Sequence, residues 1–162
     1  MKPRVSITMP VLNGAKYIDE AIESIASQTY KDFELIVVDD GSTDETPEHV
    51  KRFSGRLNLK YVRHPERRGI SRSVNDGIRQ SAGEFIAFLD HDDGWLPEFL
   101  ETQVTYLDQH PDVGMVHSDF KRPTPTAMSW RRALRSVEIV PDPAGVFFPN
   151  CLWTASLWPI VF

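Results

Sequence analysis

The chain contains a single cysteine, Cys151, among 162 residues, so it cannot form an internal disulfide. A reducing compartment such as the cytoplasm is therefore the expected location. No apolar run reaches the roughly 18 residues that a bilayer-spanning helix needs. Met1 is followed by a strand-like segment rather than by the apolar stretch of a signal peptide. We expect a cytoplasmic protein without an integral membrane segment, for which peripheral membrane association stays open.

An excess of positive charge is missing as well. Eighteen Lys and Arg residues stand against 23 Asp and Glu, which gives a net charge of −5 and argues against nucleic acid as the main partner. The chain lacks the glycine-rich dinucleotide motif, the P-loop and the G-x-S-x-G motif of hydrolases, and its five histidines show no metal-ligand spacing. These absences leave phosphate binding through a metal ion open.

The composition that is present, 41% hydrophobic and 25% charged residues, is ordinary for one globular domain. Strand-like segments alternate with helical periodicities as far as about residue 118. This alternation favours right-handed crossovers and an α/β fold with a mostly parallel sheet flanked by helices. The pattern predicts strands over 4–9, 33–38, 59–62, 84–89 and 113–116, and helices over 15–28, 47–53, 71–81 and 97–109.

Two details of these elements can be predicted from single residues. Pro10 is expected to stop the first strand. In the helix 71–81, Val74 and Ile78 are the apolar residues at helical spacing, so we expect them to point inward.

Two of the predicted strands end in clusters of carboxylates. The apolar run from Phe85 to Leu89 leads directly into Asp90, Asp92 and Asp93. Like charges repel one another and resist burial, so a hard divalent cation such as Mg²⁺ or Mn²⁺ would stabilise this cluster. A solvated acidic loop would show the same pattern, and an isolated D-x-D-D motif does not distinguish the two.

The second cluster, Asp39 and Asp40, follows the strand predicted over 33–38. In doubly wound sheets an acidic side chain at this point typically binds a nucleoside. A carboxylate only accepts hydrogen bonds, so it suits a ribose hydroxyl or the N3–H of uracil. An Asx-turn with a helix cap is the structural alternative.

The basic residues between 63 and 72 are either solvated surface or a source of charge-assisted hydrogen bonds to a diphosphate. Arg72 is the preferred candidate because it falls on the first turn of a predicted helix. His91, between the acids, is interpreted as a spacer rather than as a ligand.

Residues 4 to about 120 resemble the N-terminal, nucleotide-sugar-binding half of family 2 inverting glycosyltransferases, which have the Rossmann-like GT-A fold. The matching segments occur in the family's order and at its spacings. They are Val5-Ser6-Ile7 with 10–14, Ser27-Gln28-Thr29 with 33–44, Gly69-Ile70-Ser71 with 75–78, 83–93 with Pro97, and 112–116 with Ser118-Asp119. The family often has an aromatic residue where Leu12 stands and an arginine where Val74 stands, and Arg72 is interpreted as the substitute for that arginine.

The resemblance implies a donor site for a nucleotide-diphosphate sugar, with UDP-sugars favoured. The donor-binding residues it implies are Pro10, Val11, Asn13, Asp40, Arg72 and Asp90. The implied ligands of Mg²⁺ or Mn²⁺ are Asp92, Asp90 and Asp93. In such enzymes the metal neutralises the departing nucleoside diphosphate, while an acceptor hydroxyl attacks the anomeric carbon from the opposite face with the help of a general base. A saccharide or lipid-linked acceptor and a role in cell-surface polysaccharide synthesis are expected.

The resemblance divides the chain into a nucleotide-sugar-binding GT-A domain over 1–120 and an irregular tail over 121–162, a partial remnant of a truncated acceptor-binding part. After Asp119 the only carboxylates are Glu138 and Asp142, so the catalytic base is expected to be absent. A non-catalytic nucleotide-sugar-binding module is therefore the alternative. A phosphatase of the haloacid-dehalogenase type is a further one, because Asp90-His91-Asp92 is similar to its D-x-D motif, although those acids should follow the first strand.

Overall fold

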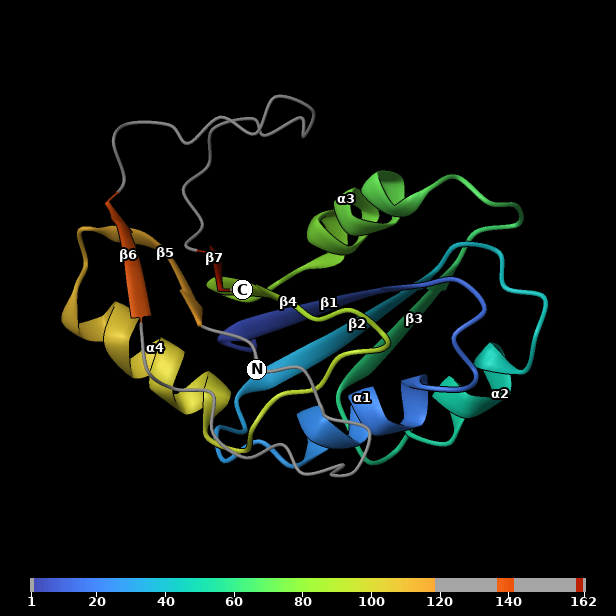
Figure 1. The fold of residues 1–162 in the computed structure, drawn as a ribbon, viewed down its shortest axis with the longest axis horizontal. Coiled ribbons are helices and arrows are strands. Elements are labelled where there is room, and N and C mark those ends of the chain that lie inside the picture. The colour runs from blue at the N-terminus through green and yellow to red at the C-terminus, as the bar shows by residue number, and fades with distance from the viewer. Residues whose placement is uncertain (1, 119–136, 142–159, 162) are drawn as a thin grey trace, which may run out of the picture.

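The computed structural model describes residues 2–118, 137–141 and 160–161, and builds them around one sheet (Figure 1). The sheet has seven strands in the order β3-β2-β1-β4-β7-β5-β6. The strands are β1 (Val5–Val11), β2 (Phe33–Asp39), β3 (Leu59–Arg63), β4 (Phe85–Phe88), β5 (Val113–Ser118), β6 (Val137–Pro141) and β7 (Ile160–Val161). The helices are α1 (Ile18–Ala26), α2 (Thr46–Lys51), α3 (Ile70–Gln80) and α4 (Phe99–Gln109).

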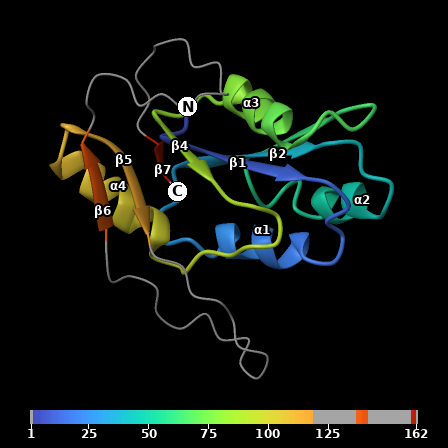
Figure 2. The ribbon, with the colours of Figure 1, turned by 45° about the horizontal axis from the view of Figure 1, so that its top comes forward.

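Helices cover both faces of this sheet. Strands β3, β2, β1 and β4 are mutually parallel neighbours, and among the strands of the described residues only β5 and β6 pair in the antiparallel sense. Helix α3 lies on one face, while α1 and α2 lie on the other (Figures 1 and 2). The expected α/β fold, a mostly parallel sheet flanked by helices, is confirmed.

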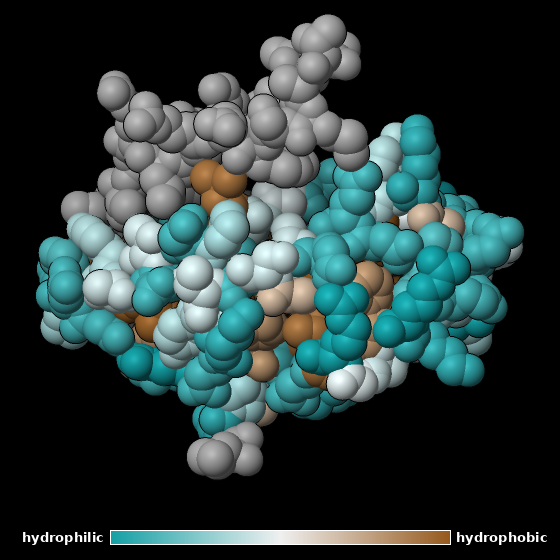
Figure 3. Space-filling view, turned by 90° about the horizontal axis from the view of Figure 1, so that it is seen from below, coloured by the Kyte–Doolittle hydropathy of each residue, from teal (hydrophilic) through white to brown (hydrophobic). Residues whose placement is uncertain are grey.

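The two faces of the sheet are packed differently. Alternate residues of β1, from Val5 to Val11, join the apolar core with Ile18 and Ile22 of α1. The residues between them, Ser6 and Thr8, are buried on the face of α3. Seen from the side of α1 and α2, the outer surface is largely polar, with apolar side chains in small patches (Figure 3).

The expectation that Pro10 stops the first strand is wrong, because β1 runs on to Val11. Proline has no N–H to donate, so it is excluded from strands that bond on both sides. Here the pairing of β1 with β4 has already ended at Thr8 opposite Phe88, while the pairing with β2 continues through Pro10. Pro10 therefore lies at a position where β1 is paired with β2 but no longer with β4.

The expected inward face of α3 is wrong as well. Ser73 and Gly77 are the buried residues of this helix, whereas Val74 and Ile78 are partly exposed. A Cβ atom added to Gly77 would lie 2.2 Å from Cγ2 of Thr8. The helix lies so close to β1 that only small side chains fit between them.

Two short segments from beyond residue 120 take part in the sheet. Strand β6 pairs with β5, and β7 lies parallel between β4 and β5. Asp142 and Cys151 lie outside the described residues. None of the helices in the described ranges has the length and hydropathy of a membrane span.

Candidate functional site

Both acidic clusters lie at the edge of the sheet where the parallel strands end, called the carboxyl edge below. Val11, the last residue of β1, pairs with Asp39 at the end of β2. On its other side, β1 pairs with β4, which ends at Phe88. One residue separates Phe88 from the segment 90–93, which carries the acids. Neighbouring strands are about 4.8 Å apart, so the two clusters start on strands about 10 Å apart. The end of β1 lies between them.

The loop after β1 is tied to the loop after β2 by hydrogen bonds. Asn13 adopts φ 52°, a left-handed conformation that asparagine tolerates better than most residues. Its backbone N–H donates to Ser42 Oγ at 2.9 Å, and its Oδ1 accepts from the Thr43 N–H at 2.9 Å. Gly14 N–H donates to Thr46 Oγ1 at 2.8 Å. These bonds give the carboxyl edge a fixed backbone.

Asp39 has a structural role in this backbone. It is fully buried, and its Oδ1 accepts from the Ser42 N–H at 2.7 Å. Its Oδ2 accepts from the Tyr61 hydroxyl, and burial, followed by this bond, raises the pKa of Tyr61. Arg63 adds a hydrogen bond to the Ser42 carbonyl at 2.7 Å.

Asp40 points to the opposite face, beneath α3, and is 4% exposed. Oδ1 accepts from His64 Nδ1 at 2.8 Å and from the Arg68 N–H at 2.8 Å, and Oδ2 accepts from the Gly69 N–H at 2.7 Å. Burial acts to raise the pKa of Asp40, but these hydrogen bonds outweigh it and lower the pKa below its usual value. Asp40 is therefore held as a carboxylate.

Residues 90–93, called the acidic turn below, present three carboxylates on the surface of the carboxyl edge. The turn is closed by the Asp93 N–H, which donates to the Asp90 carbonyl at 3.1 Å. Partial burial, followed by the charge of Asp92, raises the pKa of both Asp90 and Asp93, and His91 offsets this only in part. The turn thus holds more negative charge than its surroundings compensate.

His91 places the acidic turn against the loop after β1. A Cβ added to Gly14 would lie 2.6 Å from Cδ2 of His91, so the imidazole packs directly on this glycine. The interpretation of His91 as a spacer leaves out this contact. A glycine at position 14 is what allows the two loops to approach so closely.

The chain that follows the acidic turn is fastened to α1. Gln28 is fully buried. Its Nε2 donates to the Leu96 carbonyl at 2.8 Å, and its Oε1 accepts from the Leu100 N–H at 2.9 Å. Trp95 N–H donates to Ser24 Oγ at 3.1 Å. The chemistry of the sequence alone did not single out Gln28; the Ser-Gln-Thr segment of the family resemblance was the signal available for it.

The remaining predicted site residues differ in how far they are buried. Pro10 and Val11 are buried in β1, so their side chains support the carboxyl edge from inside. Arg72 lies on the first turn of α3 as expected, is exposed, and donates from Nε to Asp76 Oδ2 at 3.2 Å. His64, one of the basic residues between 63 and 72, is buried rather than part of a solvated surface.

A divalent cation fits the donor chemistry of the acidic turn. All three acids offer oxygen, the ligand that Mg²⁺ and Mn²⁺ prefer, and partial burial together with the charge of Asp92 raises the pKa of Asp90 and of Asp93. Within residues 2–118, 137–141 and 160–161, no three His, Cys, Asp or Glu side chains are gathered as a metal-binding cluster. Asp90, Asp92 and Asp93 remain the predicted ligands.

Comparison with solved structures identifies the same fold in proteins that bind nucleotide sugars. Residues 1–349 of Staphylococcus aureus TarS match with a TM-score of 0.69 and 33% identity, over 77% of this chain and 39% of that one. The same TarS fragment has been solved with UDP-GlcNAc. The mannosyltransferase PcManGT of Pyrobaculum calidifontis, in complex with GDP-Man and Mn²⁺, matches with a TM-score of 0.68 and 35% identity, over 75% of this chain and 36% of that one.

Comparison with curated sequences points the same way. An uncharacterized glycosyltransferase of Rickettsia prowazekii is 40% identical over 107 residues, which is 66% of this chain and 33% of the relative. EpsE of Bacillus subtilis, also named as a glycosyltransferase, is 36% identical over 110 residues, or 67% of this chain and 40% of the relative. The chain thus spans between 33% and 40% of the length of these two relatives. The family model for glycosyl transferase family 2 matches residues 6–150, and the chain belongs to this family.

Proposed function

We propose that the chain binds a nucleotide-diphosphate sugar, with UDP-sugars favoured, at the carboxyl edge, as the donor-binding part of an inverting glycosyltransferase. The observation that carries the proposal is the pair of acidic clusters on either side of the end of β1. Open α/β sheets bind ligands outside the carboxyl ends of their strands, at the point where the strand order reverses. That point here is between β1 and β4. The chain adds β2 and β3 on one side of β1 and then returns to add β4 on the other side.

Each cluster has its own part in this proposal. Asp40, held as a carboxylate, accepts from an N–H of the base, with Asn13 on the adjoining loop. Asp92 and Asp90, supported by Asp93, would hold Mg²⁺ or Mn²⁺. A bound cation would supply charge neutralisation for the leaving diphosphate. Arg72 is exposed at the start of α3 and can turn from Asp76 to a phosphate oxygen, which suits the planar fork of arginine.

A donor-binding module without transfer activity is the second candidate. A sugar acceptor must lose a proton in the transfer, which requires a general base. Glu138 and Asp142 are the carboxylates that follow Asp119 in the sequence. The proposed division into residues 1–120 for the donor and 121–162 for part of the acceptor site leaves the base unassigned. The saccharide or lipid-linked acceptor, cytoplasmic location and peripheral membrane association belong to this proposal too.

The phosphatase alternative has no support in the topology. Its D-x-D acids should follow the first strand, whereas the acidic turn follows β4, the fourth strand in the chain. A generic phosphate ester offers a direct check, and we expect no hydrolysis above background.

Calorimetric titration with UDP-sugars, dTDP-sugars and GDP-mannose, with and without Mn²⁺, tests the proposal. We expect binding of a UDP-sugar that depends on the metal and is lost in Asp92→Ala. Asp112→Ala, which removes another exposed carboxylate, serves as the matched control and should bind like the wild type. Absence of binding to every donor would refute the proposal, and turnover of a bound donor would exclude the non-catalytic candidate.

A further inference from the structure

His64 is a buried histidine between two carboxylates at the carboxyl edge. It follows β3 directly and is 5% exposed. Its Nδ1 lies 2.8 Å from Asp40 Oδ1, and its Nε2 lies 3.0 Å from Asp76 Oδ2 on α3. The imidazole therefore links the end of β2 to the middle of α3.

Both ring nitrogens of His64 face a carboxylate oxygen, Nδ1 on the side of Asp40 and Nε2 on the side of Asp76. Asp76 also accepts from Arg72 Nε at 3.2 Å and is paired with Arg79. These two arginines offset the negative charge of Asp76.

Asp40 depends on these partners for its orientation. Three of its acceptor positions are taken by His64 and the amides of Arg68 and Gly69, of about four that a carboxylate offers. The Ser73 hydroxyl also favours the charged form of Asp40, and it bonds the Gly69 carbonyl at 3.4 Å. A hydroxyl can rotate, whereas the other three donors are fixed by the backbone or by Asp76. The fully buried Ser73 hydroxyl is thus the one donor near Asp40 that can rotate away.

We propose that His64 and Asp76 are positioning residues for base recognition: His64 keeps Asp40 facing the base, and Asp76 holds the His64 ring in place. The inference rests on the proposed function, in which Asp40 accepts from an N–H of the donor's base. Burial acts to raise the pKa of Asp40, and the hydrogen bond from His64 is the first of the contacts that lower it. A protonated Asp40 would offer a donor to the base where an acceptor is required.

Uridine diphosphate and its 3-methyl analogue measure this contact directly. The methyl group replaces the N3–H of uracil, so it removes the hydrogen bond to Asp40. A hydrogen bond to a charged group contributes about 1.5–3 kcal/mol, so the wild-type chain should bind UDP at least about tenfold more tightly than 3-methyl-UDP. In His64→Ala and in Asp76→Asn we expect weaker UDP binding and a ratio between the two ligands below about threefold.

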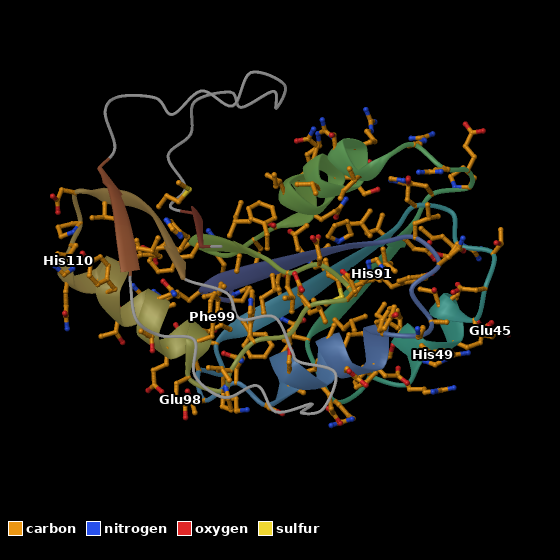
Figure 4. The ribbon with its side chains drawn as sticks, in the orientation of Figure 1. Glu45, His49, His91, Glu98, Phe99 and His110 are labelled. Atoms are coloured by element: carbon orange, nitrogen blue, oxygen red, sulfur yellow. The ribbon has the colours of Figure 1, made fainter. Side chains whose placement is uncertain are left out.

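His49→Ala is the matched control. His49, on α2 across the sheet (Figure 4), lies with Nδ1 2.9 Å from Asp19 Oδ2, so this variant also removes a histidine–aspartate pair. It should lower the thermal midpoint without changing the ratio between UDP and 3-methyl-UDP. Asp76→Asn preserves side-chain volume and an acceptor oxygen, and it carries the test if His64→Ala does not fold.

The outcomes separate this inference from the proposed function. A wild-type chain that binds UDP and 3-methyl-UDP equally overturns the positioning role while donor binding stands. Variants that lose stability but keep the wild-type ratio also overturn it, because His64 would then be structural only. A wild-type chain that binds neither ligand overturns the UDP-binding proposal and the inference that rests on it. A ratio that collapses in both variants and survives in His49→Ala supports the positioning role.

Discussion

Glu34, in the second position of β2, is a charged residue inside the sheet, with 2% of its surface exposed. Oε1 accepts from Ser6 Oγ at 2.7 Å and from the Ala82 N–H at 2.8 Å, and Oε2 lies 2.9 Å from Lys60 Nζ. Burial acts to raise the pKa of Glu34, but the bonds from Lys60, Ser6 and Ala82 outweigh it and lower the pKa. The residue joins three strands to the chain after α3 as a carboxylate.

The lowered pKa of Glu34 predicts how stability depends on pH. The folded pKa lies below the ordinary value of 4.5, so this group stabilises the fold above about pH 4.5 and loses that contribution as the pH falls through the folded pKa. Glu34→Gln should therefore lower the free energy of unfolding at pH 7 by about 1–3 kcal/mol, the range for a hydrogen bond to a charged group. The difference from wild type should shrink at pH 3.

Urea unfolding at the two pH values measures this difference, and the carboxylates common to both proteins cancel from it. Glu84→Gln is the control, since Glu84 forms an exposed pair with Arg4 that should contribute less than about 1 kcal/mol. A difference for Glu34→Gln that is as large at pH 3 as at pH 7 would contradict the role of the charge.

At the level of elements, Gln28 connects the end of α1 to the start of α4 and thereby fixes the chain that leaves the acidic turn. Gln28→Met preserves the volume but leaves the Leu96 carbonyl and the Leu100 N–H without their partner. Each unsatisfied buried group costs about 1–3 kcal/mol, so we expect the free energy of unfolding to fall by about 2–4 kcal/mol.

Hydrogen exchange locates the effect of Gln28→Met. The Leu100 amide should exchange faster, together with the segment 94–98, while the amides of β1 and β2 keep their protection. Thr29→Val is the control because the Thr29 hydroxyl is exposed in its bond to Glu101 at 2.6 Å. Unchanged exchange at Leu100 would mean that α4 is held in place by packing alone.

The sequence predicted the elements whose signals are local. Strand ends followed by acids placed both clusters at one edge, because parallel strands bring their carboxyl ends together. The extent of β1 was missed because Pro10 is tolerated only when the pairing with β4 stops early, and no pattern in β1 carries that information. Strand β7 has two residues, Ile160–Val161, which are too few for any periodicity.

The acids of the site could be predicted from the sequence, but the hydrogen bonds that connect them to other residues could not. His64 stands among arginines, so its surroundings in the sequence indicate surface, and its partners Asp76 and Asp40 are 12 and 24 residues away. Val74 and Ile78 suggested an apolar contact for α3, but Gly77 brings the helix too close to β1 for large side chains. Contacts that depend on two distant segments meeting were the ones missed.

On the scale of the whole molecule, we expect the acidic turn to lower the stability of the ligand-free protein and to favour ligand binding. Partial burial, followed by the charge of Asp92, raises the pKa of Asp90 and of Asp93, so these two acids destabilise the ligand-free fold at neutral pH and do so less as the pH falls. Asp92→Asn removes one charge from this set. We expect the free energy of unfolding of the ligand-free protein, measured with a chelator present, to rise by up to about 1 kcal/mol.

The same substitution should remove the stabilisation that a ligand provides. A ligand present at about 100 times its Kd stabilises the folded state by about 2.7 kcal/mol, so UDP with Mn²⁺ should raise the thermal midpoint of the wild-type protein by several degrees. Asp92→Asn should show no metal-dependent part of this shift, whereas Asp112→Asn should show all of it. A variant that is both more stable alone and insensitive to Mn²⁺ would show that the repulsion at the carboxyl edge is maintained for ligand binding, as expected where a site is built at the expense of stability. An Asp92→Asn protein that still responds to Mn²⁺ like the wild type would instead place the cation elsewhere.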